Sequence, residues 1–207
     1  MADDTLIPIT EEQAKLGQEL VKAFSGLGSF LADALGSTPK DLIGYLGGDW
    51  LRFRRIENIA KMMERTRERL AEAGVTETEP ASLTVALPIL RGAADESREE
   101  LQDLWARLMA AALDPSKAGS VRQGFAEVVA KMDPIDALVM GYMKSQYITG
   151  DNDDNRSVIS VALRLDISED QLEASLWNLE RLALVKQYES STHATAFGRE
   201  FMKAVSD

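Results

Sequence analysis

The chain has 207 residues, with 34 acidic against 23 basic side chains, a net charge of −11 and no cysteine. Its 45% hydrophobic and 28% charged residues are typical of a globular protein and exclude a disordered chain. The length suits one large domain or two small ones. The lack of cysteine excludes disulfides, thiolate nucleophiles and thiolate metal sites. The acidic balance opposes binding to nucleic acid or anionic lipid unless a local basic patch overcomes it.

The first residues give no sign of export. Met1-Ala2-Asp3-Asp4 lacks the basic and apolar regions of a signal peptide, and no apolar run approaches the ~18 residues of a spanning helix. We therefore expect a cytoplasmic protein, with peripheral membrane contact as an option. Residues 1–9 are predicted to form a flexible tail, and a capping box from Thr10 to Gln13 predicts the first helix.

Residues 17–48 combine seven glycines with many apolar side chains. Ser37-Thr38-Pro39 predicts a break between two short helices. Glycine costs a helix about 1 kcal/mol relative to alanine, so this density needs a reason such as close helix contact or conformational change. Two interpretations stay open, namely close packing inside a soluble bundle and engagement of a membrane after release by a trigger.

Further helices complete the predicted N-terminal domain, residues 10–132. A long charged helix over residues 49–73 ends at Gly74, and its apolar seam is Ile56, Ile59, Met63, Thr66 and Leu70. A short apolar element over residues 83–91 is interrupted by Pro88. Helices over residues 95–113 and 117–132 follow. Their predicted buried residues are Leu101, Leu104, Trp105, Leu108 and Ala112, then Val121, Phe125, Val128 and Val129.

The last third, residues 133–207, is predicted to be a separate module. Asp133 and Pro134 mark the boundary, because they suit the start of a helix over residues 135–147. A helix over residues 157–165, a helix that begins at the capping box from Ser168 to Gln171, a hairpin of residues 184–188 and 192–196, and a final helix follow. This order resembles a winged helix. The predicted fold is therefore all-α, a helical bundle followed by a winged-helix-like module with a small β-hairpin.

Winged helices often bind DNA through the third helix. Here Gln171, Ser175 and Asn178 are candidate contact residues on that helix, but residues 133–207 carry 13 acidic against 7 basic side chains. Because phosphate contacts supply most non-specific affinity for DNA, this charge favours a protein-interaction module or a homo-oligomer. A DNA-binding transcriptional regulator is the alternative, and it would need a patch formed with Arg164 and Lys186.

No catalytic, cofactor or metal residue is predicted. The single histidine, His193, lies beside Ser191 and Thr192 in the hairpin, without a nucleophile elbow or an orienting acid. Two carboxylate clusters remain. Glu96, Glu99, Glu100 and Asp103 fit a favourable helix N-terminus, whereas Asp151, Asp153 and Asp154 fit a solvated loop. A hydrolase or nuclease that uses these clusters is a third hypothesis.

Trp50 lies beside Arg52, Arg54 and Arg55 at the start of the charged helix. Such a basic and aromatic cluster suits contact with phosphate or with an interface. The competing interpretation is ion pairing with the many carboxylates of this acidic chain. We keep these four residues as candidate interaction residues.

The amino-acid sequence of residues 42–132 also resembles that of a known family. The motifs that carry the resemblance are Arg52-Phe-Arg-Arg-Ile-Glu-Asn58, the element with Pro88, and Glu100-Leu-Gln-Asp-Leu-Trp-Ala-Arg-Leu108 followed by Asp114-Pro115. They resemble the bacterial abortive-infection alpha family, a family of unknown function. The resemblance implies a role in defence against phage, and it brings no catalytic residues. We therefore expect a non-enzymatic defence protein that acts through protein contact, and through residues 17–48 if it meets a membrane.

Overall fold

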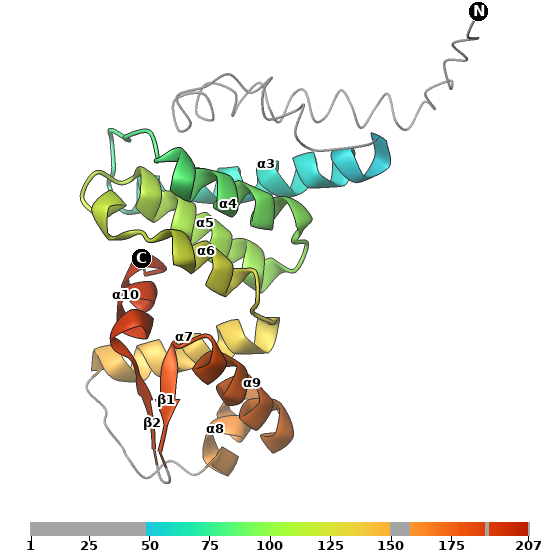
Figure 1. Ribbon diagram of the computed structural model, residues 1–207, viewed down its shortest axis with the longest axis vertical. Coiled ribbons are helices and arrows are strands. Elements are labelled where there is room, and N and C mark those ends of the chain that lie inside the picture. The colour runs from blue at the N-terminus through green and yellow to red at the C-terminus, as the bar shows by residue number, and fades with distance from the viewer. Residues whose placement is uncertain (1–48, 150–157, 189–190, 207) are drawn as a thin grey trace, which may run out of the picture.

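The computed structural model describes residues 49–149, 158–188 and 191–206, which form a mainly helical protein with one small hairpin (Figure 1). This confirms the predicted fold class. The predicted tail and the glycine-rich segment 17–48 lie outside the described residues. No described helix is both long and apolar enough to cross a membrane. The elements are α3 (Asp49–Glu72), α4 (Leu83–Asp95), α5 (Glu99–Leu113), the 3-10 turn η1 (Ala118–Ser120), α6 (Gln123–Val129), α7 (Pro134–Thr149), α8 (Val158–Leu165), α9 (Glu169–Arg181), β1 (Val185–Gln187), β2 (Thr192–Ala194) and α10 (Ala196–Ala204).

Helix α3 follows its predicted seam. Ile59, Met63, Thr66 and Leu70 are buried, and the buried Thr66 hydroxyl donates to the Met62 carbonyl at 2.8 Å. The helix ends as predicted at Gly74, whose φ of 71° only glycine adopts readily. Its neighbour supplies the closing hydrogen bond, from the Val75 N–H to the Leu70 carbonyl at 2.9 Å.

The prediction that Pro88 interrupts the next element was wrong, because α4 continues through this proline to Asp95. Proline removes one backbone hydrogen bond. Burial of the residues on both sides outweighs that loss, since Ala86, Ile89, Leu90, Ala93 and Ala94 all lie in the core.

The predicted helix over residues 95–113 starts later, at Glu99. Glu96 instead ends α4, and its carboxylate accepts the backbone N–H groups of Ser97 and Arg98 at 2.9 and 2.8 Å. This turn lets α4 fold back on α5, the central helix, which packs against α3, α4, α6 and α7. The approach of α4 to α5 is close at Gly92, where any Cβ would overlap the Trp105 ring.

The predicted helix over residues 117–132 was also too long. The Asp114 carboxylate accepts from the Ser116 N–H at 2.9 Å and from its hydroxyl at 2.7 Å. Such local side-chain bonds compete with a continuous helix, so the chain forms η1 and then the seven-residue α6. The apolar residues predicted for this region, Val121, Phe125, Val128 and Val129, are nevertheless buried.

The C-terminal elements appear in the predicted order. The Ser168 capping box is present, because its hydroxyl accepts from the Gln171 N–H at 3.2 Å and the Gln171 side chain accepts from the Ser168 N–H at 2.9 Å. Strands β1 and β2 pair antiparallel, with Lys186 opposite His193. Three helices followed by a hairpin agree with a winged helix, and this assignment stays a prediction.

One hydrophobic core joins the two parts of the chain. The Phe125 ring on α6 lies 5.4 Å from the rings of both Phe197 and Phe201 on α10. Helix α10 thereby folds back toward α5 and α6, as Figure 1 shows. The predicted boundary at residue 133 stays a prediction.

Candidate functional site

Two of the acidic side chains at the start of α5 are paired with arginines of α3. Glu99 forms an ion pair with Arg65 of α3, and Asp103 forms one with Arg69 of the same helix. The hydrogen bond from Arg65 and the charge of its guanidinium hold the pKa of Glu99 below its ordinary value. The arrangement fastens α3 to α5 along one side.

Glu96 belongs to a different element from the other members of that cluster. Its carboxylate binds the Arg98 guanidinium at 2.9 Å through both oxygens. Burial raises the pKa of this carboxyl, but the hydrogen bonds from the Arg98 side chain and backbone outweigh it, so the pKa of Glu96 lies below its ordinary value. Glu96 and Arg98 thus stabilise the turn between α4 and α5.

Among the described residues, no group of three His, Asp or Glu side chains is arranged to hold a metal ion. The second predicted cluster, Asp151, Asp153 and Asp154, lies outside the described residues. The carboxylates of Glu96, Glu99 and Asp103 are committed to arginines. Glu100, the fourth member of the first cluster, is exposed.

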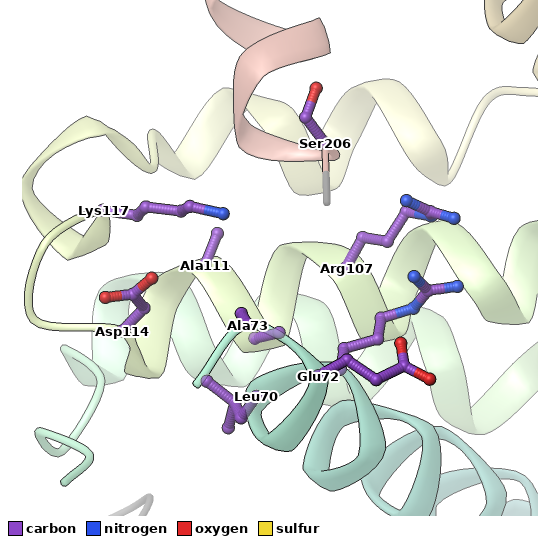
Figure 2. A pocket seen from close by; sticks show the side chains of 10 residues that line it. Leu70, Glu72, Ala73, Arg107, Ala111, Asp114, Lys117 and Ser206 are labelled. Carbon is purple, nitrogen blue, oxygen red and sulfur yellow. The ribbon is translucent and has the colours of Figure 1, made fainter. Parts of the chain in front are cut away.

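A pocket of about 130 Å³ lies where the ends of α3, α5 and α10 meet (Figure 2). Three cationic side chains line it, Arg69, Arg107 and Lys117. Arg107 also donates to the Val205 carbonyl at 3.3 Å and binds Asp103 at 2.8 Å. Because the last carbonyls of a helix carry partial negative charge, cations are stabilising where three helices end. Arg69 lies in the last turn of α3 and Arg107 reaches the Val205 carbonyl at the end of α10, so these two cations stabilise helix ends and also pair with Asp103.

The basic cluster at the start of α3 is only partly described. Trp50 and Arg52 belong to the helix, but their side chains lie outside the described residues. Arg54 is exposed and approaches Glu57 at 3.6 Å, while Arg55 binds Asp95 of α4 at 2.5 and 3.2 Å. For these two arginines the structure agrees with ion pairing inside the chain.

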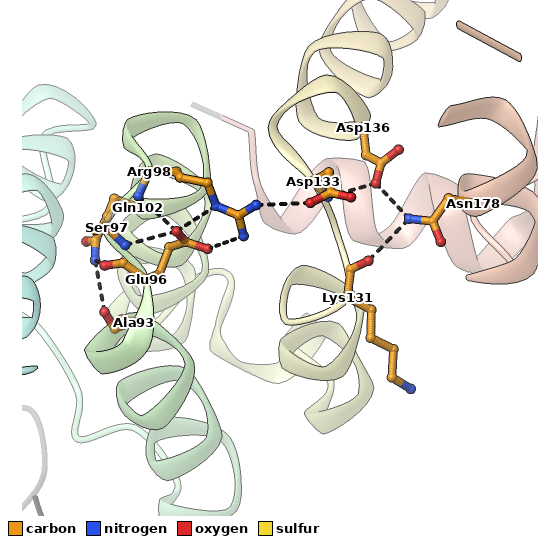
Figure 3. A network of polar contacts seen from close by, with 9 residues as sticks. All are labelled: Ala93, Glu96, Ser97, Arg98, Gln102, Lys131, Asp133, Asp136 and Asn178. Carbon is orange, nitrogen blue, oxygen red and sulfur yellow. Dashed lines mark hydrogen bonds and ion pairs between the residues drawn. The ribbon is translucent and has the colours of Figure 1, made fainter. Parts of the chain in front are cut away.

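Ser175 and Asn178 lie in a polar network that is centred on the buried carboxylate of Asp136. The Ser175 hydroxyl and the Asn178 amide each donate to Asp136 at 2.7 Å, and the Asp133 N–H donates to it at 2.8 Å. Asn178 also reaches the Lys131 carbonyl at 3.2 Å. Figure 3 shows how this network joins the start of α7 to α9.

The network continues into the helical bundle. Asp133 accepts from Arg98 at 3.0 Å, the same arginine that binds Glu96 (Figure 3). Ser175 is only 4% exposed, so its hydroxyl binds Asp136 in the interior and is not available at the surface. Of the three α9 residues selected from the sequence, only Gln171 is exposed, and its side chain caps the helix.

His193 lies on the exposed side of the hairpin. Its Nε2 is 2.9 Å from the Ser191 hydroxyl, and its ring meets the Tyr188 ring edge-on at 5.7 Å. Among residues 49–149, 158–188 and 191–206, no carboxylate hydrogen-bonds the imidazole in the way that the orienting acid of a catalytic triad does.

The sequence analysis did not select the aromatic side chain of α9, Trp177, which is 60% exposed. Asp170, Ala174, Trp177 and Arg181 recur at intervals of four, three and four, so they lie on one stripe of the helix. Leu172 and Leu179 are buried on the opposite side. The helical spacing in the sequence could have predicted this exposure, because an amphipathic helix that buries its leucines on one side exposes this tryptophan on the other.

These observations define a class of mainly helical protein in which arginines pair with Glu96, Glu99 and Asp103 and in which α9 exposes Trp177. A comparison with family profiles identifies it further. The abortive infection alpha profile matches residues 54–194, most of the chain, and the protein belongs to this family. The match begins within α3 and extends through α9 into the hairpin, beyond the resemblance seen in residues 42–132. No curated protein and no solved structure matches the chain.

Proposed function

We propose that this protein acts in bacterial defence against phage, as a non-enzymatic protein that works by contact with another protein. Membership of the abortive infection alpha family supports the defence role. The pairing of the α5 carboxylates with arginines supports a non-enzymatic mode of action.

The observation that carries the protein-contact part is Trp177. A tryptophan that is 60% exposed on a well-packed helix leaves a large apolar area in water. Tryptophan is among the residues that dominate binding energy at protein interfaces. The DNA-binding alternative gains less support, because Asp170 and Glu173 are exposed on the same helix and repel phosphate.

Membrane engagement remains a second component of the proposal, and it concerns residues 17–48 alone. Their seven glycines and interleaved apolar side chains are the supporting observation. Flotation with anionic and neutral vesicles, with dye release, tests it. Association that is lost on deletion of residues 17–48 is the expected result, and a chain that stays with the soluble fraction in phage-infected cells would remove this component.

The defence role is tested by expression in a phage-sensitive host, with the same gene carrying an early stop codon as the control. Efficiency of plating and phage released per infected cell are measured over a broad phage panel. We expect fewer plaques and infected cells that arrest before progeny are released. Unchanged plating for every phage would overturn the proposal.

A further inference from the structure

We propose that the outward side of α9 is a docking surface for a basic segment of a partner protein. We call this surface the α9 stripe, and it consists of Asp170, Glu173, Ala174, Trp177 and Arg181. The inference rests on the proposed function, because it assigns a place and a partner chemistry to the protein contact.

The position of the Trp177 side chain on the stripe is restricted by contacts with its neighbours. The Arg181 guanidinium carbon lies 5.2 Å from the centroid of the Trp177 ring, a cation–π arrangement. Arg181 is itself held by a hydrogen bond of 2.9 Å to the Asn178 side chain. Asn178 binds Asp136, so the stripe is anchored to the buried network beneath it. Such preorganisation lowers the entropic cost of binding.

The carboxylates of the stripe differ from the three that fasten α4 and α5 to α3. Asp95, Glu99 and Asp103 each bind an arginine of α3. Within the described part of the chain, Asp170 and Glu173 are exposed and have no ion pair. Asp170 belongs to the first turn and suits the helix dipole, but Glu173 lies a turn further on, where that effect has faded. The pair is therefore open to a cationic partner.

These features select one kind of occupant. A segment that carries lysines or arginines and one apolar side chain would place its charges near Asp170 and Glu173 and its apolar group on Trp177. Nucleic acid would meet like charge. Helix α3 of a second copy does not supply such a segment, because its described cations from Arg54 to Arg69 all pair with carboxylates of their own chain.

Binding of a defined probe to the full chain tests the inference. The probe is a labelled amphipathic peptide of about 18 residues made of lysine and leucine, and its Kd is measured by fluorescence anisotropy at about 0.15 M salt. A glutamate and leucine peptide of the same pattern should not bind. We expect Trp177→Ala, and separately the double variant Asp170→Lys with Glu173→Lys, to weaken binding by about tenfold or more.

The matched control is Glu68→Lys with Glu127→Lys, which makes the same change in net charge at exposed positions on α3 and α6. Binding within about twofold of the original chain is expected for this control. Equal weakening in the control would show that net charge alone attracts the peptide, and unchanged binding by Trp177→Ala would likewise overturn the docking surface. Circular dichroism checks that each variant is folded.

Plaque assays separate this inference from the defence role. If the original chain protects cells and Trp177→Ala protects them equally, the docking surface is refuted and the defence role stands. If the original chain gives no protection, the defence role fails, and the peptide measurements still decide the docking surface. A dimer in sedimentation that Trp177→Ala converts to monomer would name a second copy as the occupant and overturn the inference.

Discussion

Replacing Asp136 with alanine removes the acceptor at the centre of the network that joins α7 to α9. Asp136 is 3% exposed, and its carboxylate accepts three hydrogen bonds, from Ser175, Asn178 and the Asp133 N–H. Hydrogen bonds to charged groups contribute about 1.5–3 kcal/mol each, and a donor left buried without a partner adds about 1–3 kcal/mol. Relief from burying a charge offsets part of that loss. We expect a net decrease of about 2–4 kcal/mol in the free energy of unfolding.

Urea denaturation followed by circular dichroism measures this change. The denaturation midpoint should fall while the dependence on urea concentration stays the same, because the surface exposed on unfolding hardly changes. Ser175→Ala serves as the second arm of a double-mutant cycle, and a coupling energy of about 1–2 kcal/mol is expected for the pair. A loss below about 0.5 kcal/mol for Asp136→Ala, the range of ordinary surface changes, would refute the reasoning.

Two further predictions concern a carboxylate and a pair of glycines. The pKa of Glu96 lies below its ordinary value of 4.5, so its interaction with Arg98 stabilises the fold above that pH and is lost as the pH falls through the lowered pKa. The difference in urea midpoint between the original chain and Glu96→Gln should therefore be full at pH 7 and shrink below pH 4.5; a difference that grows in acid would contradict this. Gly198→Ala should cost about 1–3 kcal/mol or more in thermal unfolding, because its Cβ would overlap the Leu184 carbonyl oxygen. In Gly124→Ala the new Cβ has only one neighbour within 4 Å, a Phe197 ring carbon at 3.9 Å. This variant should therefore lose less thermal stability than Gly198→Ala, and an equal loss would contradict the steric argument.

Features that depend on nearby residues were predicted well. The capping box at Ser168 and Gln171 and the helix end at Gly74 each involve residues within a few positions of one another. The seam of α3 and the buried side chains around Phe125 follow from helical spacing. Such signals are complete in the sequence, because a cap or an amphipathic face needs no information from distant parts of the chain.

Features decided by distant contacts were predicted poorly. Pro88 indicated an interruption, yet burial of its neighbours against the core carries α4 past it. In the sequence, Glu99 and Asp103 formed part of a carboxylate cluster at a helix start. Only the packing of α3 on α5 shows that arginines more than thirty residues away pair with them.

The sequence by itself determined the helical class, the acidic charge, most helix positions and the family, because these depend on composition and local spacing. Only the tertiary structure decided which polar residues face inward. Ser175 and Trp177 are two positions apart on one helix, and the sequence marks the serine as the surface candidate. Packing of α9 on α7 turns Ser175 toward Asp136 and leaves Trp177 in water. A buried carboxylate must find donors, and two of those that bind Asp136 come from a helix about forty residues away.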